Sequence, residues 1–303
     1  MKNRYLNETN VQLERISKLL FNIKSGLLLM DKKKRRLKHI LTSKILNKNR
    51  KRLLYWYIGL MDGEGNFQTF PKKRPGGYYG VGYGIHLSMH IRDISLIRYL
   101  KRELKLPGRI YIYSHRDEVR LSITRLKDIK QVINKIFNKY PLINKKNRHN
   151  LARLKYGVFN QINRFNTKDE YIQFYNNYEL WKNIIAETNY KNLNIHKKEF
   201  AYWLCGFIEA EGCFIYNKRG KKEFSIEQAD KQLLALIKEK FNWSPNLYEK
   251  DRRNKRPNSI VTWSICITSI RDINTLNVFL SNPINLGLKG YKYKQYISWK
   301  YRK

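Results

Sequence analysis

An internal repeat constrains the fold of this 303-residue chain more than any other feature of its sequence. Residues 55–67 contain Gly-Leu-Met-Asp-Gly-Glu-Gly, and residues 202–214 contain Gly-Phe-Ile-Glu-Ala-Glu-Gly at the same place. The last acids of the two segments, Glu64 and Glu211, are 211 − 64 = 147 positions apart. Residues 87–93 recur at 224–230 and residues 121–128 at 265–272, with offsets of 137 and 144. Because the order is kept while the offset drifts, the sequence predicts two copies of one unit of about 100 residues, not a short-period solenoid.

Each copy alternates helical and strand-like patterns in the same order. A helix comes first, and residues 83–91 then alternate apolar and polar side chains, which is typical of a strand with one buried face. Asp93 stands where the next helix needs an N-cap, and Pro107-Gly108 breaks that helix. The predicted fold class is therefore α+β, with two pseudo-symmetric αββαββα units and antiparallel sheets. The predicted domains are a basic helical N-terminal extension (1–50), a first unit (51–150), a helical and polar linker (151–198) and a second unit (199–303).

The charge of the chain indicates its class of partner. Lys and Arg number 62 against 24 Asp and Glu, a formal net charge of 62 − 24 = +38. Such an excess repels itself unless a polyanion shares the surface, so nucleic acid is the first partner to consider, ahead of a membrane surface or a merely solvated one. We predict no spanning helix, no signal peptide and no disulfide framework, since apolar runs are short and only Cys205, Cys213 and Cys266 are present. The abundance of Lys, Asn, Ile and Tyr is typical of an AT-rich genome, such as a mitochondrial one.

The repeated segment carries the residues for chemistry. Small residues four positions apart, Gly59 and Gly63 in one copy and Gly206 and Ala210 in the other, would let two helices pack backbone to backbone. Each helix then ends in a carboxylate, where the helix dipole favours cations instead. Two converging carboxylates would repel each other, and a divalent cation between them removes that conflict. Oxygen ligands with an expected phosphate substrate favour Mg²⁺ and metal-assisted phosphodiester hydrolysis over the alternative of plain packing helices with exposed glutamates.

These two motifs, in paired αββαββα units over residues 51–303, resemble those of double-motif LAGLIDADG homing endonucleases. The resemblance implies an intron-encoded organellar enzyme that works as a monomer, without an obligate protein partner or a membrane, and cuts a long asymmetric site in double-stranded DNA. It implies metal binding by Glu64 and Glu211 with the carbonyls of Gly63 and Ala210, where Mn²⁺ or Ca²⁺ can replace Mg²⁺ in binding. It further implies catalytic support from Lys146 and Lys289, each following a proline, and from the water-organising Gln228, whose counterpart in the first copy is Ile91.

In such a fold the polar strand faces form a DNA-binding saddle, because the major groove admits a β-ribbon. Counting every second residue selects the candidate DNA contacts. In the first unit they are Asn66, Gln68, Phe70, Lys72, His86, Ser88, His90, Arg109, Tyr111, Tyr113, Arg120 and Ser122. In the second unit they are Cys213, Ile215, Asn217, Arg219, Glu223, Ser225, Glu227, Tyr248, Thr262 and Ser264.

Two other functions remain open at this point. A group I intron maturase would share the fold and bind intron RNA, and the same chain could carry both activities. A non-catalytic DNA-binding regulator would also use the saddle. The presence of both Glu64 and Glu211 favours DNA cleavage, because an RNA cofactor or a regulator needs neither acid.

Overall fold

The computed structural model describes residues 32–160, 164–177, 197–218, 220–254 and 256–302. The chain divides into two compact units, Met1–Asn49 and Arg50–Lys303. The N-terminal extension predicted over 1–50 lies outside the described residues as far as residue 31. The second unit contains both sequence repeats.

The first repeat starts with the C-terminal part of helix α2 (Lys32–Glu64). It continues through β1 (Gly65–Lys73), β2 (Tyr79–His90), η1 (Ile91–Asp93), α3 (Ile94–Glu103), β3 (Arg109–Tyr113), η2 (Ser114–Arg116), β4 (Glu118–Ile123), α4 (Leu126–Val132), the π-helical turn η3 (Ile133–Phe137) and α5 (Lys145–Phe159). Helix α6 (Lys168–Asn176) follows. The second repeat consists of α8 (Lys197–Glu211), β5 (Gly212–Tyr216), β6 (Lys222–Gln228), α9 (Lys231–Phe241), β7 (Tyr248–Lys250), β8 (Thr262–Ile267), α10 (Ile270–Ser281), η5 (Pro283–Asn285) and α11 (Tyr291–Tyr301).

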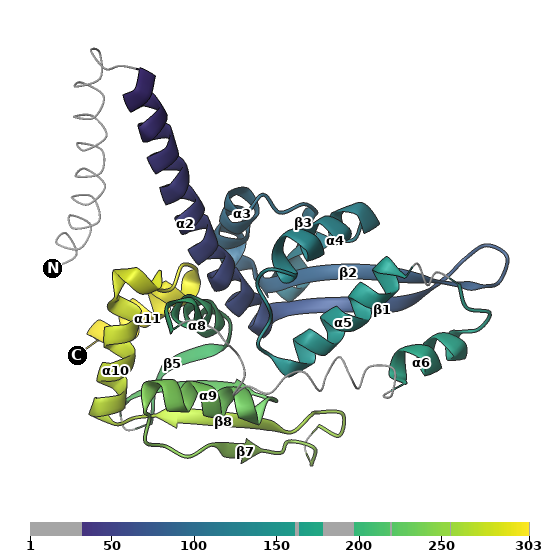
Figure 1. The fold of residues 1–303 in the computed structure, drawn as a ribbon. Coiled ribbons are helices and arrows are strands. Elements are labelled where there is room, and N and C mark those ends of the chain that lie inside the picture. The colour runs from purple at the N-terminus through teal and green to yellow at the C-terminus, as the bar shows by residue number, and fades with distance from the viewer. Residues whose placement is uncertain (1–31, 161–163, 178–196, 219, 255, 303) are drawn as a thin grey trace. The chain divides into compact units, whose positions relative to one another are not determined.

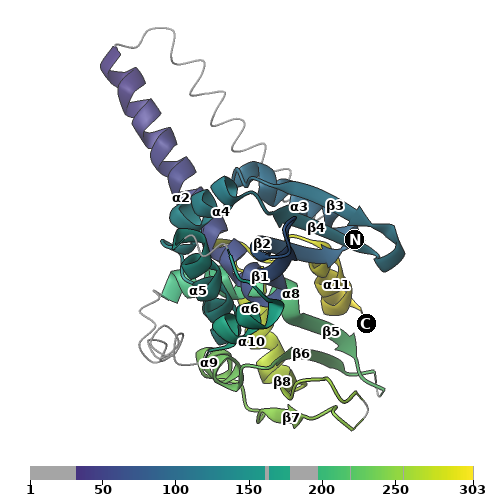
Figure 2. The same ribbon diagram turned by 90° about the vertical axis from the view of Figure 1, so that its right-hand side faces the viewer.

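Each repeat builds one four-stranded antiparallel sheet, with the orders β1-β2-β4-β3 and β5-β6-β8-β7. Helices α3, α4 and α5 contact the first sheet, and α9, α10 and α11 contact the second in corresponding places (Figures 1 and 2). The predicted fold class, α+β with two repeated units, is confirmed. One helix was not expected as part of each unit: α5 and its counterpart α11 follow the αββαββα pattern, and α5 crosses the predicted boundary at residue 150.

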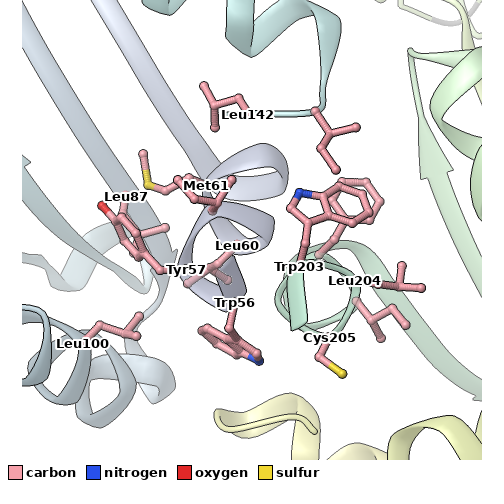
Figure 3. Packing of buried hydrophobic residues seen from close by; sticks show 14 of the residues in the cluster. Trp56, Tyr57, Leu60, Met61, Leu87, Leu100, Leu142, Trp203, Leu204 and Cys205 are labelled. Atoms are coloured by element: carbon pink, nitrogen blue, oxygen red, sulfur yellow. The ribbon is translucent and has the colours of Figure 1, made fainter. Parts of the chain in front are cut away.

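The core is continuous between the repeats. Helices α2 and α8 lie side by side at its centre, and aliphatic and aromatic side chains such as Leu60, Met61, Trp56 and Trp203 surround them (Figure 3). Trp56 and Trp203 occupy corresponding positions and are 0% and 1% exposed. Burying side chains of this size contributes roughly 2–3 kcal/mol each, so this tryptophan pair stabilises the central helix contact.

Asp93 lies at the N-cap position of α3, as predicted, but its side chain makes no capping hydrogen bond there. Its carboxylate instead accepts a hydrogen bond from the first amide of α11. Among the described residues, no helix combines the length and the apolar character needed to cross a bilayer.

Candidate functional site

Glycines in the middle of α2 and α8 bring the two helices together. A Cβ atom on Gly59 would overlap the carbonyl oxygen of Trp203, and a Cβ on Gly206 would overlap that of Trp56. The two overlaps are equivalent under the pseudo-symmetry of the repeats. Only glycine fits at these positions because backbone, which cannot move aside, occupies the space.

The same contact continues to the C-terminal ends of the helices. A Cβ on Gly63 would overlap the side chain of Ala210 and lie 3.1 Å from Oε1 of Glu211. Glu64 and Glu211 are the last residues of α2 and α8, each followed by the glycine that begins a strand. The two carboxylates proposed from the sequence are therefore neighbours at the meeting point of the repeats.

The surroundings raise the pKa of both carboxylates. Lost hydration, with the nearby charge of Glu64 as the second cause, raises the pKa of Glu211 to about 7. Lost hydration also raises the pKa of Glu64, although that residue is the more exposed of the two. The charge of Lys292 lowers the pKa of both groups in part. The centre of the molecule thus concentrates negative charge that a cation would stabilise.

The earlier acid of the first motif, Asp62, has a structural role. It is 1% exposed and accepts hydrogen bonds from the amides of Ile143 (2.7 Å) and Asn144 (3.2 Å) and from the indole of Trp203 (2.7 Å). Burial raises the pKa of Asp62 to about 7, while the three donors lower it. Asp62 therefore holds the loop that leads into α5, and its Trp203 bond ties that loop to the other repeat.

The corresponding acid of the second motif, Glu209, holds the loop that leads into α11. It is 2% exposed and accepts a hydrogen bond of 2.6 Å from the amide of Lys289. Lys289 is partly buried, and burial lowers the pKa of its ammonium, while the neighbouring Cys205 and Glu209 raise that pKa in part. The backbone of Lys289 is thus part of this loop anchor, and its side chain lies beside the interface helix.

The helix starts identify the equivalent of Lys146. Asn144 is the N-cap of α5 and Gly290 is the N-cap of α11. Lys146 lies two residues past its cap (146 − 144 = 2), and so does Lys292 (292 − 290 = 2). Counting from the prolines predicted Lys289 instead, because the second copy inserts the η5 turn and two residues with positive φ, Leu286 and Gly287, before the helix. Counting from the helix start would have found Lys292.

Gln228 lies next to the acidic pair. It ends β6 on the face that also carries Ile226, and a hydrogen bond with Gln228 lowers the pKa of Glu211. The side chain of Asn144 donates to its Oε1 at 3.3 Å. The loop of one repeat and the strand of the other thus orient this amide together.

The strand registers put every described base-contact candidate within the strands on one face of its sheet. In the first sheet the cross-strand partners are Asn66–His86–Ser122–Arg109, Ser88–Arg120–Tyr111 and His90–Glu118–Tyr113. In the second they are Cys213–Ser225–Cys266, Ile215–Glu223 and Glu227–Ser264–Tyr248. Residues one position away, such as Phe67, Leu87, Phe224 and Ile265, are buried against the helices.

Three of these candidates are covered by their neighbours. His86 and Ser122 are each 9% exposed and share a hydrogen bond of 2.6 Å, and Ser264 is 2% exposed. Alternation gives the face of a sheet but not what covers it, and base contact by these three residues stays a prediction. Arg219 lies outside the described residues.

Glu227 is already engaged within the protein. Both guanidinium amines of Arg252 contact its two carboxylate oxygens, and Lys250 and Thr262 donate to it at 2.9 and 2.7 Å. The hydrogen bonds from Arg252 foremost hold the pKa of Glu227 down at about 2. The carboxylate of Glu227 is therefore neutralised by Arg252 and Lys250 on the polar face of the second sheet.

Comparison with known proteins agrees with this geometry. The family model described as LAGLIDADG endonuclease matches residues 57–156 and 204–302, one match in each repeat. A probable intron-encoded endonuclease aI3 of Kluyveromyces lactis is 30% identical over 272 residues, covering 80% of this chain and 63% of that protein. An uncharacterized mitochondrial protein RF1 of Saccharomyces cerevisiae is 29% identical, covering 63% of this chain and 39% of that protein. The chain thus spans less than two thirds of the length of these relatives.

Solved structures share the fold over most of the chain. The LAGLIDADG homing endonuclease I-LtrWI bound to its target DNA aligns with a TM-score of 0.61 and 25% identity, covering 83% of this chain and 89% of that one. I-SmaMI, bound to an uncleaved DNA target in the presence of calcium ions, aligns with a TM-score of 0.58 and 18% identity, covering 82% and 89%. The latter likeness concerns the fold alone.

Proposed function

Because the chain belongs to the LAGLIDADG endonuclease family, we propose that it is a homing endonuclease that makes a double-strand break at one long, asymmetric DNA site. The observation that carries this proposal is the contact of α2 with α8, which makes Glu64 and Glu211 neighbours in the middle of a +38 protein. A protein that only bound a polyanion would gain nothing from two carboxylates at that point.

The donor set fits a hard divalent cation, and we infer that it is Mg²⁺. The ligands would be Glu64 and Glu211 with the carbonyls of Gly63 and Ala210. Among the described residues no three His, Cys, Asp or Glu side chains converge on one point, so the remaining ligands would be DNA phosphate oxygens and water. A bound Mg²⁺ supplies an activated water and stabilises the leaving oxygen. The same ligands would also bind Mn²⁺ or Ca²⁺.

The surrounding residues would orient and neutralise the reacting groups. Lys146 and Lys292, each at the start of a helix, would balance charge that develops on the phosphate. Gln228 would orient a water near Glu211. Asp62 and Glu209 would act indirectly, by fixing the loops that carry the two lysines.

The exposed polar residues of both sheets would contact the duplex. Gln68 and Asn66 suit adenine, and the arginines suit guanine or phosphate. Binding should weaken steeply with salt, with a log–log slope of about −0.9 for each phosphate neutralised. The protein would be intron-encoded, as the Kluyveromyces lactis relative is named, and would act as a monomer in the mitochondrion, the organelle in the name of the Saccharomyces cerevisiae relative.

Selection of cleaved sequences from a randomised duplex library with Mg²⁺ tests the proposal. We expect one long preferred site, cut by the wild type and not by Glu64→Gln or Glu211→Gln, while both variants still bind it. Glu239→Gln removes one charge from an exposed position of α9 and is the matched control with full activity. Normal cleavage by either variant of the central pair would contradict the metal-ligand assignment. No cleavage by the wild type, together with tight binding of a group I intron RNA, would favour the maturase.

A further inference from the structure

Each repeat holds the start of the other repeat's lysine helix. Asp93, which follows β2, accepts a hydrogen bond of 2.6 Å at Oδ1 from the amide of Tyr291, the first residue of α11. Asp230, which follows β6, accepts one of 3.2 Å at Oδ2 from the amide of Lys145, the first residue of α5. The two aspartates are sequence equivalents at the offset of 230 − 93 = 137. The crossed arrangement is therefore a pseudo-symmetric feature of the fold.

These bonds satisfy amides that a helix cannot satisfy itself. The first amides of a helix lack intrahelical acceptors, and a carboxylate there also interacts favourably with the helix dipole. Helix α5 has a local cap, because Asn144 accepts from the amide of Asn147. The N-cap of α11 is Gly290, which has no side chain to offer. Its start therefore depends more on the other repeat.

Asp93 is committed to this task to a greater extent than Asp230. Asp93 makes no side-chain cap in its own helix α3, and it is 8% exposed. Asp230 divides its carboxylate, since Oδ1 accepts from Leu233 in its own helix α9 at 3.1 Å. The guanidinium of Arg92 adds a second contact to α11, 4.1 Å from the ring centre of Tyr291.

Gly290 is enclosed by the carboxylates that hold it. A Cβ there would lie 2.5 Å from Oδ1 of Asp93 and 2.7 Å from Oε1 of Glu209. One carboxylate comes from each repeat, so the start of α11 is fixed between the two halves. Lys292 follows two residues later, and its charge acts on Glu64 and Glu211.

We propose that Asp93 and Asp230 are positioning residues that set the two lysines from across the repeat boundary, Asp93 for Lys292 and Asp230 for Lys146. Each lysine thus reaches its working place only when both repeats are docked. The position of Lys292 depends on the bond from Asp93 more than the position of Lys146 depends on the bond from Asp230, because α5 also has a local cap. The consequence for catalysis rests on the proposed function, whereas the crossed bonds themselves do not.

Hydrogen exchange on the full chain tests the crossed bonds without any DNA. Asp93→Ala should speed amide exchange at the start of α11 about fivefold, the effect of losing one cap. Asp93→Asn keeps an oxygen acceptor and should restore most of the protection. Asp230→Ala should speed exchange at the start of α5 by less. Unchanged exchange in α11 of Asp93→Ala would overturn the proposal.

Strand-resolved cleavage of the selected target tests the consequence. Asp93→Ala and Lys292→Met should slow the same DNA strand, by about tenfold for the positioning residue. The double variant should be no slower than Lys292→Met alone. Asp230→Ala and Lys146→Met should slow the opposite strand. Asp272→Asn is the control, because among the described residues the carboxylate of this buried aspartate accepts from Ser244 of its own repeat and its amide donates to Ser269.

The outcomes separate the two claims. Equal slowing of both strands by Asp93→Ala, or a double variant much slower than Lys292→Met, would overturn the positioning role while leaving the nuclease intact. A wild type that cuts no DNA would remove the proposed function and with it the strand bias, and the exchange experiment would still decide whether the repeats hold each other's helices.

Discussion

The two sheets have the same strand order, but the polar groups on their open faces are differently engaged. In the first sheet β1 and β2 have 9 and 12 residues, and Asn66 and Gln68 are exposed. In the second, β5 and β6 have 5 and 7 residues, and Glu227 is held by Arg252, Lys250 and Thr262. The shared backbone plan with different side-chain chemistry is what the reading of two unlike half-sites requires.

The first sheet also receives support beyond its own repeat unit. Phe165 pairs with Tyr79 through two backbone hydrogen bonds of 2.8 Å, and Tyr171 of α6 donates to Thr69 at 3.1 Å. Together with the ring contact of Tyr171 and Tyr175, these bonds brace the long β1–β2 ribbon. A long ribbon needs such support, since an isolated two-stranded hairpin is marginally stable.

The largest expected effect tests whether the halves are equivalent at their contact. Gly59→Ala and Gly206→Ala should each destabilise the protein by about 3 kcal/mol, the upper end of overpacking costs, because each new Cβ meets backbone of the facing helix. The free energy of unfolding in urea measures this. Ser95→Ala, at an exposed position of α3, should stay within about 0.5 kcal/mol of the wild type. A marked difference between the two glycine variants would break the pseudo-symmetry of the helix pair.

The next largest effect concerns Trp56 and Trp203, which occupy equivalent positions but donate to different acceptors. Trp203 donates to the buried carboxylate of Asp62 at 2.7 Å, whereas its counterpart Trp56 donates to the carbonyl of Gly287 at 2.9 Å. Replacement by phenylalanine removes the donor in both cases, but only Trp203→Phe leaves a buried carboxyl group less satisfied. We expect Trp203→Phe to cost about 1.5 kcal/mol more than Trp56→Phe in urea unfolding. Equal losses would mean that packing alone sets the cost.

The sequence contained most of what builds this architecture. The repeat fixed the unit, period-two alternation gave the correct face for the strand residues, and the small-residue spacing anticipated the contact of Gly59 with Trp203. What local pattern does not contain is the offset between loops. The sequence analysis did not select Lys292, because the η5 turn lengthens the segment between Pro283 and α11. The equivalence of Lys292 with Lys146 follows from the positions of the two helix starts.

The polar contacts between the repeats could not be predicted from the sequence. Asp93 has the position of a local cap, and it serves α11 nearly two hundred residues later in the chain. Burial of His86 and Ser264 depends on neighbours on adjacent strands, which alternation does not register. In each case the missing information is the packing of one element on another, which distant parts of the chain determine together.

A matched pair of arginine clusters sharpens the comparison of the sheets for DNA reading. In the second sheet Glu227 holds Arg252, and in the first sheet Glu118 holds Arg120, which also donates to Ser88 at 2.9 Å. If Arg252 contacts a base, Glu227→Gln weakens its anchor and should lower discrimination between bases at that position by about 1 kcal/mol, or fivefold. Glu118→Gln should do the same at a position in the other half-site. Binding to singly substituted targets measures both, and a uniform loss across all positions would show that these arginines contact only phosphate.

The smallest expected effect concerns acid stability, and it again separates the two clusters. The hydrogen bonds from Arg252 foremost lower the pKa of Glu227 to about 2, below its unfolded value near 4.5, so the folded state binds this proton later than the unfolded state. The stabilisation is therefore fully present above pH 4.5 and is lost as the pH falls toward 2. Because Glu227 keeps 30% of its side chain exposed, screening limits the effect to about 0.5 kcal/mol.

Glu118 behaves similarly but more weakly. Burial raises its pKa, and the hydrogen bonds of Arg120 and Ser88 lower it by more, so the net shift is downward and smaller than that of Glu227. Urea unfolding at pH 6 and pH 3 should thus show a flatter pH dependence for Glu227→Gln than for the wild type, and a weaker flattening for Glu118→Gln. A stronger flattening for Glu118→Gln than for Glu227→Gln would show that the first sheet holds the stronger ion pair, which would reverse the comparison of the two sheets.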